Sequence, residues 1–175
     1  MTGEPAARFV FAPMTEPDAR AVAAWRYEGP YALYNADPAR LDETLRALLA
    51  PRNHYYAVRT TEDGLVGTFC FGPDAQVPGG DYDDLDALDI GLGLRPELTG
   101  RGLGEAFLLA GLAFAREQFV PAPTRFRLTV ATFNRRAIRV YEHAGFRPTH
   151  RFVRPSDGHE FLQMDRPAWL PATKG

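Results

Sequence analysis

Apolar residues recur along the chain with two spacings, one typical of strands and the other of helices. Short apolar or alternating runs predict buried or half-buried strands. Apolar positions three and four residues apart, as at Leu41, Leu45, Leu48 and Leu49, predict an amphipathic helix. We predict strands over residues 8–14, 55–59, 65–71, 88–94, 126–131, 147–153 and 161–164, and helices over 15–25, 37–49, 103–118 and 134–143.

The sequence also marks where several of these elements begin and end. Residues 15–18 have the capping residue and early proline of a helix start, and residues 62–64 form a hairpin signal. Strands followed by alternating strands and helices predict an α/β fold with a mixed sheet. A chain of 175 residues with 45% apolar content can bury one core. We therefore predict a single domain over 1–167 and a loose tail over 168–175.

Charge and cysteine content exclude several classes of protein. The formal net charge of −2 gives no overall attraction to nucleic acid or to an anionic membrane. No apolar stretch approaches the roughly 20 residues that span a bilayer, and residues 1–13 lack the regions of a signal peptide. Cys70 is the single cysteine, and no Cys/His cluster has zinc spacing. We expect a cytoplasmic protein that uses no metal, nucleic acid or membrane.

A glycine-rich loop is the first candidate for chemistry. An apolar run stops at Pro96, and glycines follow at every second position, Gly100, Gly102 and Gly104, before a strongly apolar helix-like segment. Glycines so placed leave backbone N–H groups accessible at a helix N-terminus. These donors and the helix dipole together favour a phosphate group.

A second motif follows about thirty residues later. Asn134, Ala137, Tyr141, Gly145 and Phe146 have the spacing N-x-x-A-x-x-x-Y-x-x-x-G-F. With the glycine loop, this motif resembles the acetyl-CoA-binding motifs of the GNAT superfamily of N-acetyltransferases, over roughly residues 88–147. The resemblance implies a single-domain α/β fold with a mostly antiparallel sheet flanked by helices. It also implies acetyl-CoA as co-substrate and direct transfer of the acetyl group to a primary amine.

The resemblance assigns a cofactor-binding role to several residues. The backbones of Leu92 and Leu94 would pair with the pantetheine amides, and one N–H there would polarise the thioester carbonyl. The family pattern Q/R-x-x-G-x-G/A starts here with Thr99, which departs from Gln or Arg, so Arg101 would supply the charge at the pyrophosphate. The cofactor-binding set is Leu92, Leu94, Thr99, Gly100, Arg101, Gly102, Leu103, Gly104 and Asn134.

Two residues are candidates for the proton transfers of the reaction. Tyr141 would protonate the departing CoA thiolate, and the alternative is a tyrosine that packs its helix onto the sheet. Asp89 would take a proton from the amine, as an acidic residue does in some relatives, and the alternative base is water. Asp89 also ends an acidic run with Asp81, Asp83, Asp84 and Asp86, which is typical of a solvated loop but would attract a cationic acceptor if it bordered the cleft.

The acceptor is the least determined part of the prediction. Trp25, Tyr27, Tyr31 and Tyr34 would line the acceptor pocket, or form a small satellite core. An amine-bearing small molecule, a protein N-terminus or a lysine side chain would fit equally, and relatives often form homodimers. Two alternatives stay open: a catalytically silent acyl-CoA sensor, and a transferase of larger acyl groups, because Gly91 and Gly93 could widen the thioester end.

Overall fold

The structure, a computed structural model, describes residues 8–169. It is an α/β fold whose seven strands follow the order β1-β2-β3-β4-β5-β7-β6. The β4–β5 pair is parallel, whereas β1–β2, β2–β3, β5–β7 and β6–β7 are antiparallel. The chain divides into two compact units, and β4 passes from one to the other between Gly91 and Leu92. The predicted fold class, a mostly antiparallel sheet flanked by helices, is confirmed.

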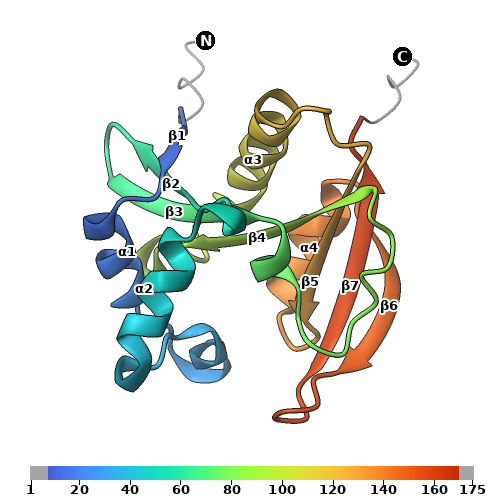
Figure 1. Cartoon of the computed structure of the whole chain (residues 1–175), viewed down its shortest axis with the longest axis horizontal. Helices are drawn as coiled ribbons and strands as arrows, with labels where there is room; N and C mark the ends of the chain where they lie inside the picture. The colour runs from blue at the N-terminus through green and yellow to red at the C-terminus, as the bar shows by residue number, and fades with distance from the viewer. Residues whose placement is uncertain (1–7, 170–175) are drawn as a thin grey trace. The chain divides into compact units, whose positions relative to one another are not determined.

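The first unit contains residues up to 70 together with residues 92–103. Its elements are β1 (Val10–Pro13), α1 (Glu16–Ala23), the 3-10 helix η1 (Gly29–Tyr34), α2 (Leu41–Leu49), β2 (Tyr56–Thr60), most of β3 (Gly64–Phe71) and the end of β4. Figure 1 shows β1, β2 and β3 as an antiparallel series beside α1 and α2.

Local sequence explains how α1 starts and how it packs. The Thr15 hydroxyl accepts from the Asp18 N–H and the Asp18 carboxylate accepts from the Thr15 N–H, which together form a capping box. Ala19 of α1 packs with Leu45 and Leu48 of α2 in a small apolar cluster. The capping signal and the leucine spacing in the sequence therefore predict this helix pair correctly.

The second unit contains residues 71–91 and 104–169 of the described chain. Its elements are the first part of β4 (Ala87–Leu94), α3 (Gly104–Gln118), β5 (Arg125–Ala131), α4 (Arg135–His143), β6 (Arg147–Val153) and β7 (Glu160–Pro167). Figure 1 shows β5, β7 and β6 side by side. The core is apolar, with Phe71, Phe107, Phe126, Phe146 and Met164 fully buried.

The predicted boundaries near the C-terminal end of the described chain differ from the structure. The last strand continues to Pro167, because Asp165 pairs with Arg125 at 2.6 Å and Arg166 donates to the Ala144 carbonyl, so charged residues are accommodated in it. Ala168, predicted as the start of a loose tail, is 0% exposed and its N–H donates to the Thr124 carbonyl. Residues 170–175 lie outside the described part of the chain.

Candidate functional site

The loop before α3 takes its shape from two glycines. Gly100 (φ +73°) and Gly102 (φ +78°) lie in the left-handed region, where a side chain is strained. Among residues 8–169, no acceptor is hydrogen-bonded to the backbone N–H groups of 100–103. These donors lead into a helix of 15 residues, whose dipole adds positive potential at that end. A phosphate-binding role for this loop stays a prediction.

The remaining predicted loop residues have distinct local roles. A Cβ on Gly104 would approach Val140 Cγ2 of α4 to 3.4 Å, so the third glycine permits close packing of α3 on α4. Thr99 Oγ1 donates to the Pro96 carbonyl at 2.7 Å, so this hydroxyl stabilises the turn itself. Leu103 is half-buried and Arg101 is exposed. The role of Arg101 in supplying charge at the pyrophosphate stays a prediction.

The second half of β4 meets a tyrosine from the segment after α1. The Tyr27 hydroxyl donates to the Leu94 carbonyl at 2.5 Å. A Cβ on Gly93 would lie 3.7 Å from the Tyr27 hydroxyl oxygen and 3.7 Å from Thr68 Oγ1. Leu92 and Leu94 are half-buried. The structure thus places Tyr27, predicted at the acceptor wall, in contact with the strand end predicted to hold the thioester.

Tyr27 is fixed at its backbone as well as at its ring. The Tyr27 N–H donates to Asn35 Oδ1 at 2.7 Å, and Asn35 Nδ2 donates to the Tyr27 carbonyl at 3.1 Å. Burial, together with the nearby negative charge of Glu97, raises the pKa of Tyr27 to about 12. Its phenol is therefore neutral at ordinary pH and acts as a hydrogen-bond donor.

The first half of β4 carries a buried ion pair. Asp89 and Arg127 are each 6% exposed; Arg127 Nε donates to Asp89 Oδ1 at 2.6 Å and Nη2 donates to Oδ2 at 2.9 Å. Gln76 Nε2 donates to the same Oδ2 at 2.9 Å. Hydrogen bonding to Asp89 raises the pKa of Arg127. Both oxygens of the predicted general base are thus engaged, which favours a structural role for Asp89.

Several polar residues in and near this ion pair, Arg127 itself among them, are not singled out by the sequence. The Arg127 guanidinium lies over the Tyr82 ring at 5.0 Å, and the Tyr82 hydroxyl bonds to Thr129 Oγ1 at 2.8 Å. Gln163, 1% exposed, accepts from the Asp81 N–H and donates to the Asp81 carbonyl. The sequence signal is a charged or amide residue within an apolar strand, at Arg127 and Gln163, which indicates a buried polar partner.

The acidic run before β4 is an exposed loop that caps its own turns. The Asp83 N–H donates to Asp81 Oδ1 at 3.2 Å, and the Asp86 N–H donates to Asp84 Oδ1 at 3.0 Å. These contacts are typical of Asx turns. The solvated-loop interpretation accounts for them, and a role in attracting a cationic acceptor stays a prediction.

The second motif forms α4 and its N-terminal cap. Asn134 Oδ1 accepts from the Ala137 N–H at 3.2 Å, so the first two motif positions close the start of the helix. Ile138 and Tyr141 lie on the same half-buried face, while the arginines of α4 are exposed. The Tyr141 ring packs edge-on against Phe146, with the centroids 6.2 Å apart. The helix-face prediction holds, whereas the acid role of Tyr141 stays a prediction.

The aromatic segment, which lies between two predicted helices, includes the short 3-10 helix η1. Tyr31 and Tyr34 belong to η1, while Trp25 and Tyr27 precede it. Trp25, Tyr27 and Tyr31 are half-buried, and Tyr34 is 43% exposed. Partial exposure leaves ring surface available to a ligand, so an acceptor role for this segment remains a proposal.

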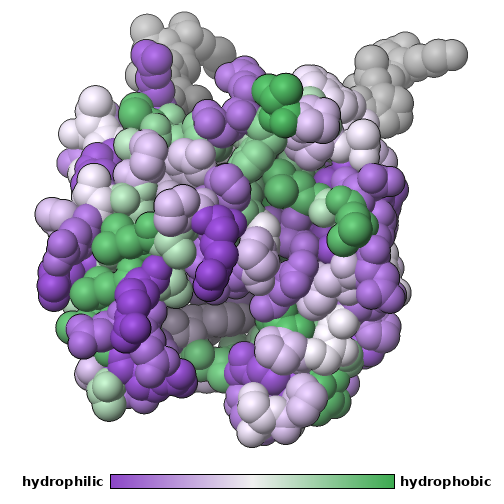
Figure 2. Space-filling view, viewed as in Figure 1, coloured by the Kyte–Doolittle hydropathy of each residue, from purple (hydrophilic) through white to green (hydrophobic). Residues whose placement is uncertain are grey.

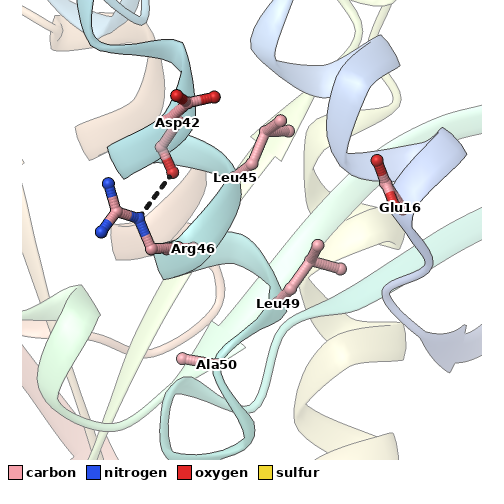
Figure 3. A pocket seen from close by; sticks show the side chains of 6 residues that line it. All are labelled: Glu16, Asp42, Leu45, Arg46, Leu49 and Ala50. Atoms are coloured by element: carbon pink, nitrogen blue, oxygen red, sulfur yellow. Dashed lines mark hydrogen bonds between the residues drawn. The ribbon is translucent and has the colours of Figure 1, made fainter.

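A hollow of about 480 Å³ lies between α1 and α2, away from the predicted residues. Figure 3 shows Leu45 and Leu49 projecting from α2 towards α1, which carries Glu16 at the rim. Arg46 Nε donates to the Asp42 carbonyl at 3.2 Å beside it. Apolar side chains reach the surface over these helices (Figure 2). None of the predicted catalytic, cofactor or acceptor residues lines the hollow.

The described residues carry neither a metal-binding cluster nor a membrane-spanning helix. Over 8–169, no three His, Cys, Asp or Glu side chains are grouped so as to hold a metal ion. No helix in that same range has the length and apolarity needed to cross a bilayer.

Comparison with protein families matches residues 8–147 to the model of the acetyltransferase (GNAT) domain. The chain belongs to the GNAT acetyltransferase family. The match covers β1 to α4 and ends at Arg147, the first residue of β6, so it includes both motifs. The curated proteins contain no match.

Solved structures share the fold at low sequence identity. A chimera of the Vibrio cholerae spermidine N-acetyltransferase SpeG and hSSAT has a TM-score of 0.70 at 16% identity, covering 91% of this chain and 95% of that one. A GNAT-family acetyltransferase from Bacillus anthracis has a TM-score of 0.68 at 17% identity, covering 94% and 97%. Another structure is SpeG from Vibrio cholerae in complex with manganese ions, with a TM-score of 0.65 at 14% identity, covering 91% and 92%. These likenesses establish the fold of this GNAT member.

Proposed function

We propose that this GNAT member transfers the acetyl group of acetyl-CoA to a primary amine. The loop of residues 100–103 carries the proposal, because its glycines present uncommitted N–H donors ahead of α3 in a chain of this family. Those donors would bind the pyrophosphate, and Arg101 would add a positive charge. Thr99 keeps its hydroxyl in the turn, so backbone donors contribute more here than the side chain at that position.

Acetyl transfer forms a C–N bond and breaks a C–S bond at the thioester carbonyl carbon. The amine nitrogen attacks the thioester carbonyl carbon, an oxyanion forms, and the C–S bond breaks as the amide is completed. A backbone N–H of the Leu92–Leu94 segment would hold the oxyanion, and such a donor contributes most when charge develops in the transition state. Leu94 already uses its carbonyl as an acceptor for Tyr27. An oxyanion needs hydrogen-bond donors, so the backbone N–H groups of this segment, and not its carbonyls, would fill this role.

Two protons must also move. The proton lost by the amine would pass to water, because the carboxylate oxygens of Asp89 are bonded to Arg127 and Gln76. Tyr141 would give its phenolic proton to the CoA thiolate and regain one from solvent. Its position on the half-buried face of α4 supports this assignment.

An amine is the proposed acceptor. The Trp25–Tyr34 segment offers partly exposed aromatic rings, on which a cationic amine can stack. The spermidine N-acetyltransferases that share the fold make polyamines the first class to test. The other classes of amine to test are amino acids, aminoglycosides and short peptides.

The experiment measures CoA release from acetyl-CoA with each amine pool, using wild type and Tyr141→Phe. We expect turnover in one pool and a kcat that falls about 100-fold in the variant, the scale of a lost general acid. Acetyl-CoA affinity should stay within about 3-fold, since the ring remains. Tyr56→Phe, on β2, is the matched control. Tight acetyl-CoA binding without CoA release from any pool would contradict acetyl transfer to these amines.

A further inference from the structure

We propose that Arg166 of β7 is a positioning residue for Tyr141, because its buried guanidinium holds the C-terminal end of α4 on which the Tyr141 ring depends. The inference rests on the proposed function for the chemical role of Tyr141, the protonation of the CoA thiolate. The positioning itself rests on contacts within the second unit.

Arg166 is a buried charge whose partners are uncharged. It is 4% exposed, and over residues 8–169 its side chain makes no ion pair with a carboxylate. Its Nε donates to the Pro167 carbonyl at 2.9 Å, and its Nη1 donates to the Ala144 carbonyl at 2.8 Å. Burial of a guanidinium costs free energy unless its surroundings compensate for the lost water. The C-terminal end of α4 supplies carbonyl oxygens and the negative end of the helix dipole.

The end of α4 is a Schellman motif that begins at Tyr141. Gly145 (φ +92°) lies in the left-handed region, its N–H donates to the Glu142 carbonyl at 3.0 Å, and the Phe146 N–H donates to the Tyr141 carbonyl at 3.0 Å. The Phe146 ring is fully buried and packs against the Tyr141 ring. The backbone and the ring of Tyr141 are therefore both fixed by this helix end.

Arg166 contacts both parts of the motif. Its Nη1 binds the Ala144 carbonyl next to Gly145, and its guanidinium lies over the Phe146 ring, 5.9 Å from the centroid. Loss of the guanidinium would remove the donor from a buried carbonyl and one neighbour from that ring. We expect the Tyr141 phenol to shift as a result, and a displacement of about 1 Å at a catalytic group can lower the rate about 100-fold.

The test is a double-mutant cycle on kcat with an accepted amine. Arg166→Met should lower kcat about 100-fold in wild type but by no more than about 3-fold in the Tyr141→Phe background, because a residue that acts through Tyr141 has nothing left to position. Arg166→Lys should give an intermediate loss, since lysine keeps the charge without the planar fork. The Kd for acetyl-CoA should stay within about 3-fold in each variant.

The matched control is Gln163→Met in the same strand. Gln163 is 1% exposed, and its side chain bonds the backbone of Asp81 rather than α4. This variant also removes buried polar contacts of β7, so it should lower stability but leave kcat within about 3-fold of wild type. All variants are compared at a temperature at which circular dichroism shows them folded.

A second readout needs no turnover. In protein labelled with fluorotyrosine, the fluorine NMR signal of Tyr141 is identified among the seven tyrosines by its absence in Tyr141→Phe. Arg166→Met should shift or broaden this signal, and Gln163→Met should leave it unchanged. A signal that moves in Arg166→Met without turnover in any variant would support the positioning and contradict acetyl transfer.

Other outcomes overturn the inference. Additive losses of kcat in the cycle, or a Tyr141 signal unchanged in folded Arg166→Met, would do so while turnover upholds the proposed function. Turnover that Tyr141→Phe does not slow would also overturn it. If Arg166→Met does not fold, the same cycle is measured with Arg166→Lys, and additive losses there overturn the inference.

Discussion

The two halves of β4 make different kinds of polar contact. Ala87–Ile90 pairs with Arg125–Leu128 of β5, and Asp89 is buried there against Arg127. Leu92–Leu94 belongs to the other unit, is half-buried, and meets a neutral tyrosine hydroxyl at its last carbonyl. One strand thus carries a buried ion pair in its first half and a half-buried, glycine-containing segment in its second half. A carboxylate on a strand near a proposed site is therefore not by itself evidence for a catalytic base.

The largest expected effect comes from removing one partner of the Asp89–Arg127 ion pair in the first half of β4. Arg127→Met leaves the Asp89 carboxylate buried without its partner, which should lower the free energy of unfolding by about 3–5 kcal/mol. The measurement is urea unfolding followed by circular dichroism. The double variant Asp89→Leu/Arg127→Met removes both charges and should recover most of that loss.

A further variant, Asp89→Asn, separates a structural Asp89 from a catalytic one. If Asp89 only holds Arg127, folded Asp89→Asn protein should keep a kcat within a few-fold of wild type. A kcat reduced more than about 100-fold with an intact unfolding transition would instead make Asp89 the general base. A decrease of less than about 1 kcal/mol in the free energy of unfolding of Arg127→Met would contradict a stabilising role for the Asp89–Arg127 ion pair.

A smaller effect on stability, which depends on pH, is expected at Tyr27, the tyrosine that contacts the second half of β4. An unperturbed tyrosine titrates near pH 10, whereas burial raises the pKa of Tyr27 to about 12. Because folding favours the neutral phenol, its contribution to stability is complete below pH 10 and is lost as pH rises towards 12. We expect the stability difference between wild type and Tyr27→Phe to be constant up to about pH 10 and to change above it. A Tyr27-dependent absorbance change at about 295 nm centred near pH 10 would contradict the burial.

Regular elements and the cofactor motifs can be predicted from the sequence because their signals are local. The leucines of α2, the cap at Thr15 and the glycines at 100 and 102 each determine the backbone within a few residues. No helix is predicted from the sequence over Gly29–Tyr34, where η1 forms, because so short a 3-10 helix has no periodic apolar pattern.

Contacts between distant residues cannot be predicted in the same way. Tyr27 and Leu94 are 67 positions apart, and Asp89 and Arg127 are 38 apart. The sequence shows that each residue is polar or aromatic, but its partner depends on tertiary packing. The position of Asp89 in its strand therefore suggests a general base. Its contact with Arg127, which favours a structural role, is seen only in the tertiary structure. The prediction of a tail at Ala168 differs from the structure for the same reason, because its partner Thr124 is distant in sequence.

Acetyl-CoA binding to Gly102→Ala and Gly158→Ala, measured by calorimetry, tests most directly whether the loop of residues 100–103 binds phosphate. Both glycines have positive φ, +78° and +74°, with open space where a Cβ would be, so both variants carry the same backbone strain of about 1 kcal/mol. Only Gly102 lies among the N–H donors proposed for the pyrophosphate. We expect the Kd for acetyl-CoA to rise about 10-fold or more in Gly102→Ala and to be unchanged in Gly158→Ala. Equal Kd values for the two folded variants and wild type would contradict phosphate binding at this loop.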